Sequence, residues 1–109
     1  MGNKGRSEDK DSAQMQNRDG DINEIRSRID AVDTRLLEAF CERMRLSEQV
    51  AAYKQQNRLP LEDIEREQAV IDKVSEDSGA YGHYAEELFR TLIRLSKEYQ
   101  REVIGGKTV

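Results

Sequence analysis

Two cations stand at a spacing that could hold a small anion. Arg43 and Lys54, in "CERMRLSEQVAAYK", are 11 residues apart in a segment with helical periodicity. This is about three turns, so the side chains would differ by only about 20° in direction, with their backbones about 16 Å apart. Long side chains reaching toward each other would leave a gap suited to a small anionic molecule. A structural ion pair at Arg43 beside a solvated Lys54 is the plainer interpretation.

Arg43 also interrupts an apolar seam. In heptad numbering Ile22, Ile29 and Leu36 take consecutive a positions, Arg43 takes the next and Val50 the one after. Arg43 is therefore predicted to point inward. A buried guanidinium is too costly to stay unpaired, so it must meet a carboxylate of the protein or an anion from outside.

Further polar groups stand where apolar ones would be expected. Near the C-terminus the stripe of Phe89 and Ile93 continues to Ser96 and Gln100, which are four residues apart on one helical face. These two uncharged hydrogen-bonding groups end an otherwise apolar stripe.

A charged cluster occurs in "EDIERE". Asp63, Arg66 and Glu67 are predicted to share the helix face opposite Ile64 and Ile71. Standing alone, the cluster would be interpreted as an ordinary charged surface.

Metal or thiol chemistry has little support. His83 is the single histidine and Cys41 the single cysteine, and neither has a partner at ligand spacing. We therefore expect no metal and no cofactor, with Cys41 as a small helix-packing residue and His83 at the surface or in packing.

Three helices are predicted to position these residues, over about 22–57, about 60–76 and about 82–103. Pro60 lies near the predicted first turn of the second helix. "SEDSGAYG", before the third helix, has the composition of a loop. The expected fold class is all-α, with one long and two shorter helices per chain.

One domain over residues 21–104 accounts for this pattern. Residues 1–20 are polar without apolar periodicity and are predicted to be disordered, and residues 105–109 are predicted to form a flexible tail. A helix of about 35 residues is about 50 Å long, whereas a domain of some 90 residues is only about 25–30 Å across. The exposed seam of the long helix therefore needs a second chain.

The composition excludes several function classes. The net charge is −4 and no long basic run occurs, so neither nucleic acid nor an acidic membrane surface is an expected partner. The sequence contains no apolar span of about 20 residues and no signal-peptide core. The expected location is the cytoplasm.

The chain closely resembles the all-helical chorismate mutases of the AroQ class. The resemblance runs from about Ile22 to Gln100 and is carried by four motifs in order. They are "IRSRIDAVDTRLLEAFCERM", the Lys54 that follows it, "LPLEDIERE" and "LFRTLIRLSKEYQ". The resemblance implies an intertwined homodimeric helical bundle that converts chorismate to prephenate in phenylalanine and tyrosine biosynthesis, without a cofactor.

The resemblance also implies roles for individual residues. Arg26 matches an arginine that one chain contributes to the other chain's site, and Arg43 matches an arginine that binds a substrate carboxylate. Lys54 and Gln100 match the two groups on the ether oxygen, and Ser96 matches a carboxylate ligand.

The matches in the second helix complete the set. Arg66 corresponds to a residue that supports anion binding, whereas the Asp63 region and Glu67 correspond to the groups that receive the ring hydroxyl. Arg26 and Lys54 are 28 residues apart, which is about 42 Å along one helix. If both contact one substrate, Arg26 must come from another chain.

Two other functions are compatible with such a fold. An isochorismate pyruvate lyase would share the fold and several cations, although the intact "DIERE" favours the mutase. A helical module that only dimerises or regulates another enzyme would usually have lost a cation or Gln100, and this chain retains them.

Overall fold

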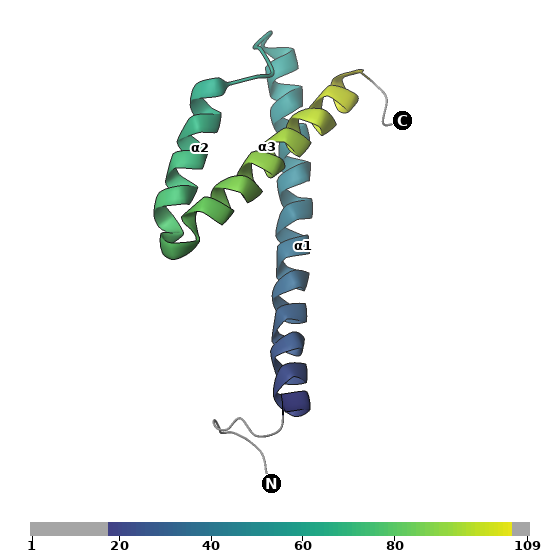
Figure 1. Cartoon of the computed structure of the whole chain (residues 1–109). Coiled ribbons are helices and arrows are strands. Elements are labelled where there is room, and N and C mark those ends of the chain that lie inside the picture. The colour runs from purple at the N-terminus through teal and green to yellow at the C-terminus, as the bar shows by residue number, and fades with distance from the viewer. Residues whose placement is uncertain (1–17, 106–109) are drawn as a thin grey trace. The chain divides into compact units, whose positions relative to one another are not determined.

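The structure, a computed structural model, describes residues 18–105 (Figure 1). They form α1 (Arg18–Gln56), α2 (Ile64–Asp77), the 3-10 helix η1 (Gly79–Tyr81) and α3 (Gly82–Gly105). No strand occurs in this part of the chain, and the all-α prediction is confirmed. The predictions for residues 1–17 and 106–109 lie outside the described residues.

Helix α1 begins earlier than its predicted start at 22. Residues 18–20, which the sequence pattern assigned to the polar N-terminal segment, are helical. The first four N–H groups of a helix have no intrahelical acceptor, so a polar stretch without apolar periodicity is compatible with its first turn. The helix ends because Arg58 adopts a positive φ of 55°, which lets the Leu59 N–H donate to the Lys54 carbonyl at 2.8 Å.

Helix α2 begins at Ile64, four residues after the predicted start at Pro60. Asp63 is its N-cap, and the carboxylate accepts a hydrogen bond from the Arg66 N–H at 3.1 Å. The Leu61 carbonyl accepts a hydrogen bond from the Lys54 ammonium at 2.8 Å. The segment before α2 is therefore held by a side chain of α1 and closed by a favoured capping residue.

The connection between α2 and α3 is more regular than the loop predicted over 75–82. Helix α2 continues to Asp77, and the Ser78 N–H and hydroxyl both donate to the Val74 carbonyl, at 3.1 and 2.5 Å. Gly79 then takes a left-handed conformation with φ of 59°. Figure 1 shows α3 turning back from the end of α2, and these two helices pack against each other.

The described residues divide into two structural units, 18–40 and 41–105. In the first unit every residue from 21 to 39 is exposed, and Ile25 and Ile29 of the apolar seam are each about half exposed, at 52% and 51%. In the second unit the buried apolar residues are Ala51 and Ile71, whereas Ser47, Ser96 and Gln100 are buried polar residues. The described part of the chain therefore buries little apolar surface of its own.

Within the described residues, none of the helices combines the length and the apolar character that crossing a bilayer would require.

Gly82 provides a stability test of the α2–α3 packing. It is buried, and a Cβ atom at this position would lie 2.8 Å from the Ser75 carbonyl oxygen. The added methyl group could be accommodated only if the main chain of α2 or α3 shifted. Gly82→Ala is therefore expected to lower the free energy of unfolding by about 1–3 kcal/mol. Urea unfolding followed by circular dichroism at one fixed protein concentration measures this change. Unchanged stability would contradict the packing.

Candidate functional site

Arg43 is half-buried on α1 and is bound by a hydroxyl group. Its Nη1 donates to the Ser96 Oγ at 2.5 Å. Burial lowers the pKa of Arg43, and the positive charge of Arg66 lowers it further. Among residues 18–105, no carboxylate forms an ion pair with Arg43. The described residues thus place two guanidinium groups near each other without a compensating carboxylate at Arg43, which suits an anion.

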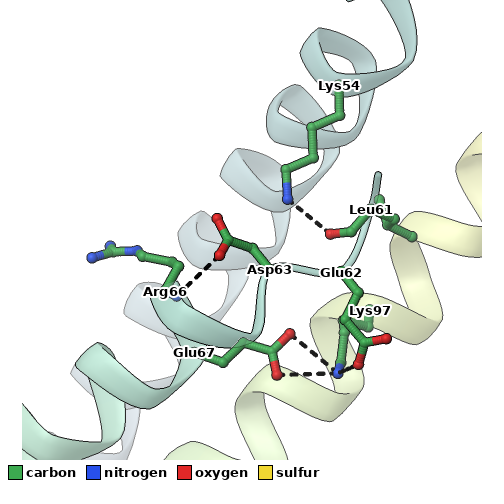
Figure 2. A network of polar contacts seen from close by, with 7 residues as sticks. All are labelled: Lys54, Leu61, Glu62, Asp63, Arg66, Glu67 and Lys97. Atoms are coloured by element: carbon green, nitrogen blue, oxygen red, sulfur yellow. Dashed lines mark hydrogen bonds and ion pairs between the residues drawn. The ribbon is translucent and has the colours of Figure 1, made fainter. Parts of the chain in front are cut away.

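Lys54 is half-buried on the same helix. Its ammonium donates to the Leu61 carbonyl at 2.8 Å, as Figure 2 shows, and it makes no ion pair within the described part of the chain. An ammonium carries three hydrogens, so this bond leaves two available to another acceptor.

Gln100 is buried on α3 and oriented by main chain of α1. Its Nε2 donates to the Ser47 carbonyl at 3.0 Å, and the second hydrogen on that nitrogen is left for another acceptor. Beside it, Tyr99 donates to the Glu48 carboxylate at 2.9 Å. This hydrogen bond, together with burial, raises the pKa of Tyr99. The two bonds fasten α3 to the C-terminal part of α1 at the position of Gln100.

Asp63, Arg66 and Glu67 do not lie together on one face of α2. Asp63 lies before the helix and caps it, so it does not share a helix face with the other two. Figure 2 shows Arg66 and Glu67 pointing to different sides of α2. Glu67 turns toward α3, where both its carboxylate oxygens lie 3.2 Å from the ammonium of Lys97.

Lys97 was not among the residues predicted from the sequence. It also contacts the Glu62 carboxylate at 2.9 Å. Its pKa is raised, chiefly by the hydrogen bond to Glu62 and also by Glu67, although burial opposes the shift. These contacts join residues 30 and 35 positions apart. No helical spacing could have indicated them.

A surface groove of about 300 Å³ lies between α2 and α3, but most of the predicted site residues are not part of it. Of that set only Glu67 lines the groove. Its other lining residues are Ile64, Gln68, Ile71, Arg90, Ile93, Arg94 and Lys97. Arg43 and Gln100 instead take part in contacts between α1 and α3, and Lys54 contacts the segment before α2.

Arg26 belongs to the other structural unit. It lies on the exposed part of α1 before Phe40. In the described part of the chain, no group of histidine, cysteine and acidic side chains could hold a metal ion.

Comparison with known proteins identifies the class of protein. The family described as chorismate mutase type II matches residues 25–101. The chain therefore belongs to the type II chorismate mutase family, in agreement with the resemblance seen in the sequence. No solved structure matches the chain significantly.

Individual relatives support this membership. A chorismate mutase of Methanocaldococcus jannaschii is 31% identical over 84 residues, which are 74% of this chain and 85% of that protein. A monofunctional chorismate mutase of Enterobacter agglomerans is 37% identical over 68 residues, 60% of this chain and 38% of that protein. A bifunctional chorismate mutase/prephenate dehydratase of the same organism is 32% identical over 91 residues, 81% of this chain but 24% of that protein.

The capping role of Asp63 can be tested by stability measurements. Asp63→Ala is expected to lower the free energy of unfolding by about 1 kcal/mol, because the Arg66 N–H loses its acceptor. Asp63→Ser retains a capping oxygen and should retain most of the stability. Glu65→Ala, an exposed change in the first turn of α2, is the control. If Asp63→Ser and Asp63→Ala were equally destabilised in urea, the capping role would be wrong.

Proposed function

We propose that the chain catalyses the Claisen rearrangement of chorismate to prephenate, as a cytoplasmic step of phenylalanine and tyrosine biosynthesis. The observation that carries the proposal is the half-buried Arg43, which has a hydroxyl partner and a neighbouring guanidinium but no carboxylate within the described residues. Membership of the chorismate mutase family supports the choice of substrate, a small dianion.

In this proposal the guanidinium groups bind the two substrate carboxylates. Arg43 and Arg66 of one chain, with Arg26 of the partner subunit, would hold the flexible dianion in its reactive conformer. Ser96, already in contact with Arg43, would add a hydroxyl to the carboxylate ligands. Holding the reacting atoms together removes much of the entropic part of the barrier of a unimolecular rearrangement.

In this proposal Lys54 and Gln100 stabilise the transition state of the bond rearrangement. The ether bond breaks as the carbon–carbon bond forms, and negative charge grows on the ether oxygen. Both residues are pre-oriented by a main-chain carbonyl and keep unused N–H groups. Donors held in place before the reaction commonly stabilise such charge by a few kcal/mol each.

The ring hydroxyl is assigned to Glu67, with the Asp63 region beside it. Glu67 is half-buried and its carboxylate is oriented by a contact from α3. The Asp63 carboxylate is engaged in capping α2 through one oxygen, Oδ1. Asp63 would therefore contribute to this site chiefly by fixing the start of α2.

A homodimer completes the site in this proposal. The apolar seam on the first part of α1, which includes Ile22, Ile25 and Ile29, is exposed in the described chain. Covering it with the same surface of a second copy would generate two equivalent sites by two-fold symmetry. The long helix would then both form the interface and deliver Arg26 across it.

Removing either central cation tests the activity. Arg43→Ala and Lys54→Ala are each expected to lower kcat/KM for chorismate by about a hundredfold or more, because each loses a preorganised donor. Loss of chorismate absorbance, with prephenate identified as the product, measures the rate. Arg45→Ala, which removes an exposed cation from the same helix, is the matched control.

Near-normal turnover in either variant would contradict the assignment. Pyruvate release from isochorismate by the unaltered chain would identify the lyase instead. A folded dimer that leaves both compounds unchanged would identify a non-catalytic module.

Mixing variants tests whether Arg26 acts across the interface. Arg26→Ala and Lys54→Ala are each expected to be inactive, but a mixed dimer would contain one site with both residues intact. Refolding the two variants together in equal amounts makes about half of the dimers mixed, so about a quarter of normal activity should return. If Arg26 served its own chain's site, the mixture would stay inactive.

A further inference from the structure

Lys97 on α3 contacts two carboxylates with different surroundings. Its ammonium lies 2.9 Å from Glu62 and 3.2 Å from both oxygens of Glu67. The Glu67 side chain is 24% exposed and that of Lys97 is 20% exposed, whereas that of Glu62 is 53% exposed. Solvent screens the ion pair between Lys97 and Glu62 more strongly than the ion pair between Lys97 and Glu67. Water therefore weakens the contact with Glu67 less, although it is the longer of the two.

The contact with Glu67 constrains how that carboxylate is presented. Because one ammonium lies 3.2 Å from both oxygens, any movement of the carboxylate away from α3 would lengthen both contacts, so Lys97 restricts where the Glu67 carboxylate lies. Each carboxylate oxygen has two lone-pair directions, so the contact with Lys97 leaves acceptor capacity for a hydroxyl. Figure 2 shows Lys97 and Glu67 reaching toward each other between α2 and α3.

We propose that Lys97 is a positioning residue that holds the Glu67 carboxylate in the orientation that accepts the ring hydroxyl of the substrate. The inference rests on the proposed function, because it assigns Lys97 a part in that same site. Lys97 itself does not touch the substrate in this account.

A purely structural role makes a different prediction. Glu62 lies in the segment that precedes α2, so its contact with Lys97 also fastens that segment to α3. If fastening were the whole role, Glu62→Gln would reproduce part of the kinetic effect of losing Lys97. If orientation of Glu67 is the role, Glu62→Gln leaves the kinetics unchanged.

The expected effect is on substrate binding. A hydroxyl that takes no part in bond making or breaking is bound equally in the ground state and the transition state, so weakening its acceptor raises KM without lowering kcat. Lys97→Met keeps much of the side chain but removes the charge. It is expected to raise KM for chorismate about five- to tenfold, with kcat within about twofold of normal.

The test is steady-state kinetics on the full chain with chorismate as substrate. The variants are Lys97→Met, Lys97→Gln, Lys97→Arg, Glu67→Gln, Glu62→Gln and the double variant Lys97→Met with Glu67→Gln. We expect both neutral variants to raise KM and Lys97→Arg to restore it to within about threefold of normal. The double variant should have the KM of Glu67→Gln alone, because residues that act through one group are not additive.

Three results would overturn the inference: a normal KM in folded Lys97→Met or Lys97→Gln, independent multiplication of the two effects in the double variant, or a KM rise in Glu62→Gln that matches that of Lys97→Met. Thermal melts at one protein concentration identify which neutral variants are folded.

The failure of the proposed function can be told apart from the failure of this inference. If the unaltered chain does not convert chorismate, the proposed function is wrong, and so is the role proposed for Lys97. If the unaltered chain is active and the Lys97 variants bind normally, only the role of Lys97 is wrong.

Discussion

The electrostatic environment of Arg43 is the constraint on which the rest of the site depends. A half-buried guanidinium is stable only with hydrogen-bond partners and with compensation of its charge. The chain provides the hydrogen bond through Ser96 on α3, and it places a second guanidinium, that of Arg66, near enough to lower the Arg43 pKa. Such an arrangement is unfavourable by itself and becomes favourable when a dianion is bound, which couples the stability of the site to its ligand.

The same principle explains why the neighbouring donors are held by main chain and not by acidic side chains. The Lys54 ammonium and the Gln100 amide each donate to a main-chain carbonyl, which orients them without neutralising a charge or using all their hydrogens. Two nearby acidic side chains, Glu62 before α2 and Glu67 in its first turn, are instead paired with Lys97 of α3. Positive charge without acidic partners is thus kept near Arg43 and Lys54 in the described unit.

Much of the fold follows from the sequence because helices leave local signals. The heptad spacing from Ile22 to Val50 predicts a long helix, and the all-α class is confirmed. The start of α2 was misplaced because Pro60 has the character of a first-turn residue, whereas the capping bond of Asp63 decides where the helix begins. The inward position expected for Arg43 follows from periodicity, but its partner, the Ser96 hydroxyl, does not. Contacts such as Lys97 with Glu67 depend on how α2 and α3 pack and carry no local signal.

A structure of the chain with a stable bicyclic dicarboxylate shaped like the transition state would test the central claim most directly, since such analogues bind where catalysis occurs. The account predicts a ligand carboxylate on the Arg43 guanidinium, the ether oxygen within hydrogen-bond distance of Lys54 and Gln100, and Arg26 of the partner subunit on the second carboxylate. A ligand bound only in the groove between α2 and α3, with Arg43 still bound to Ser96 alone, would contradict it.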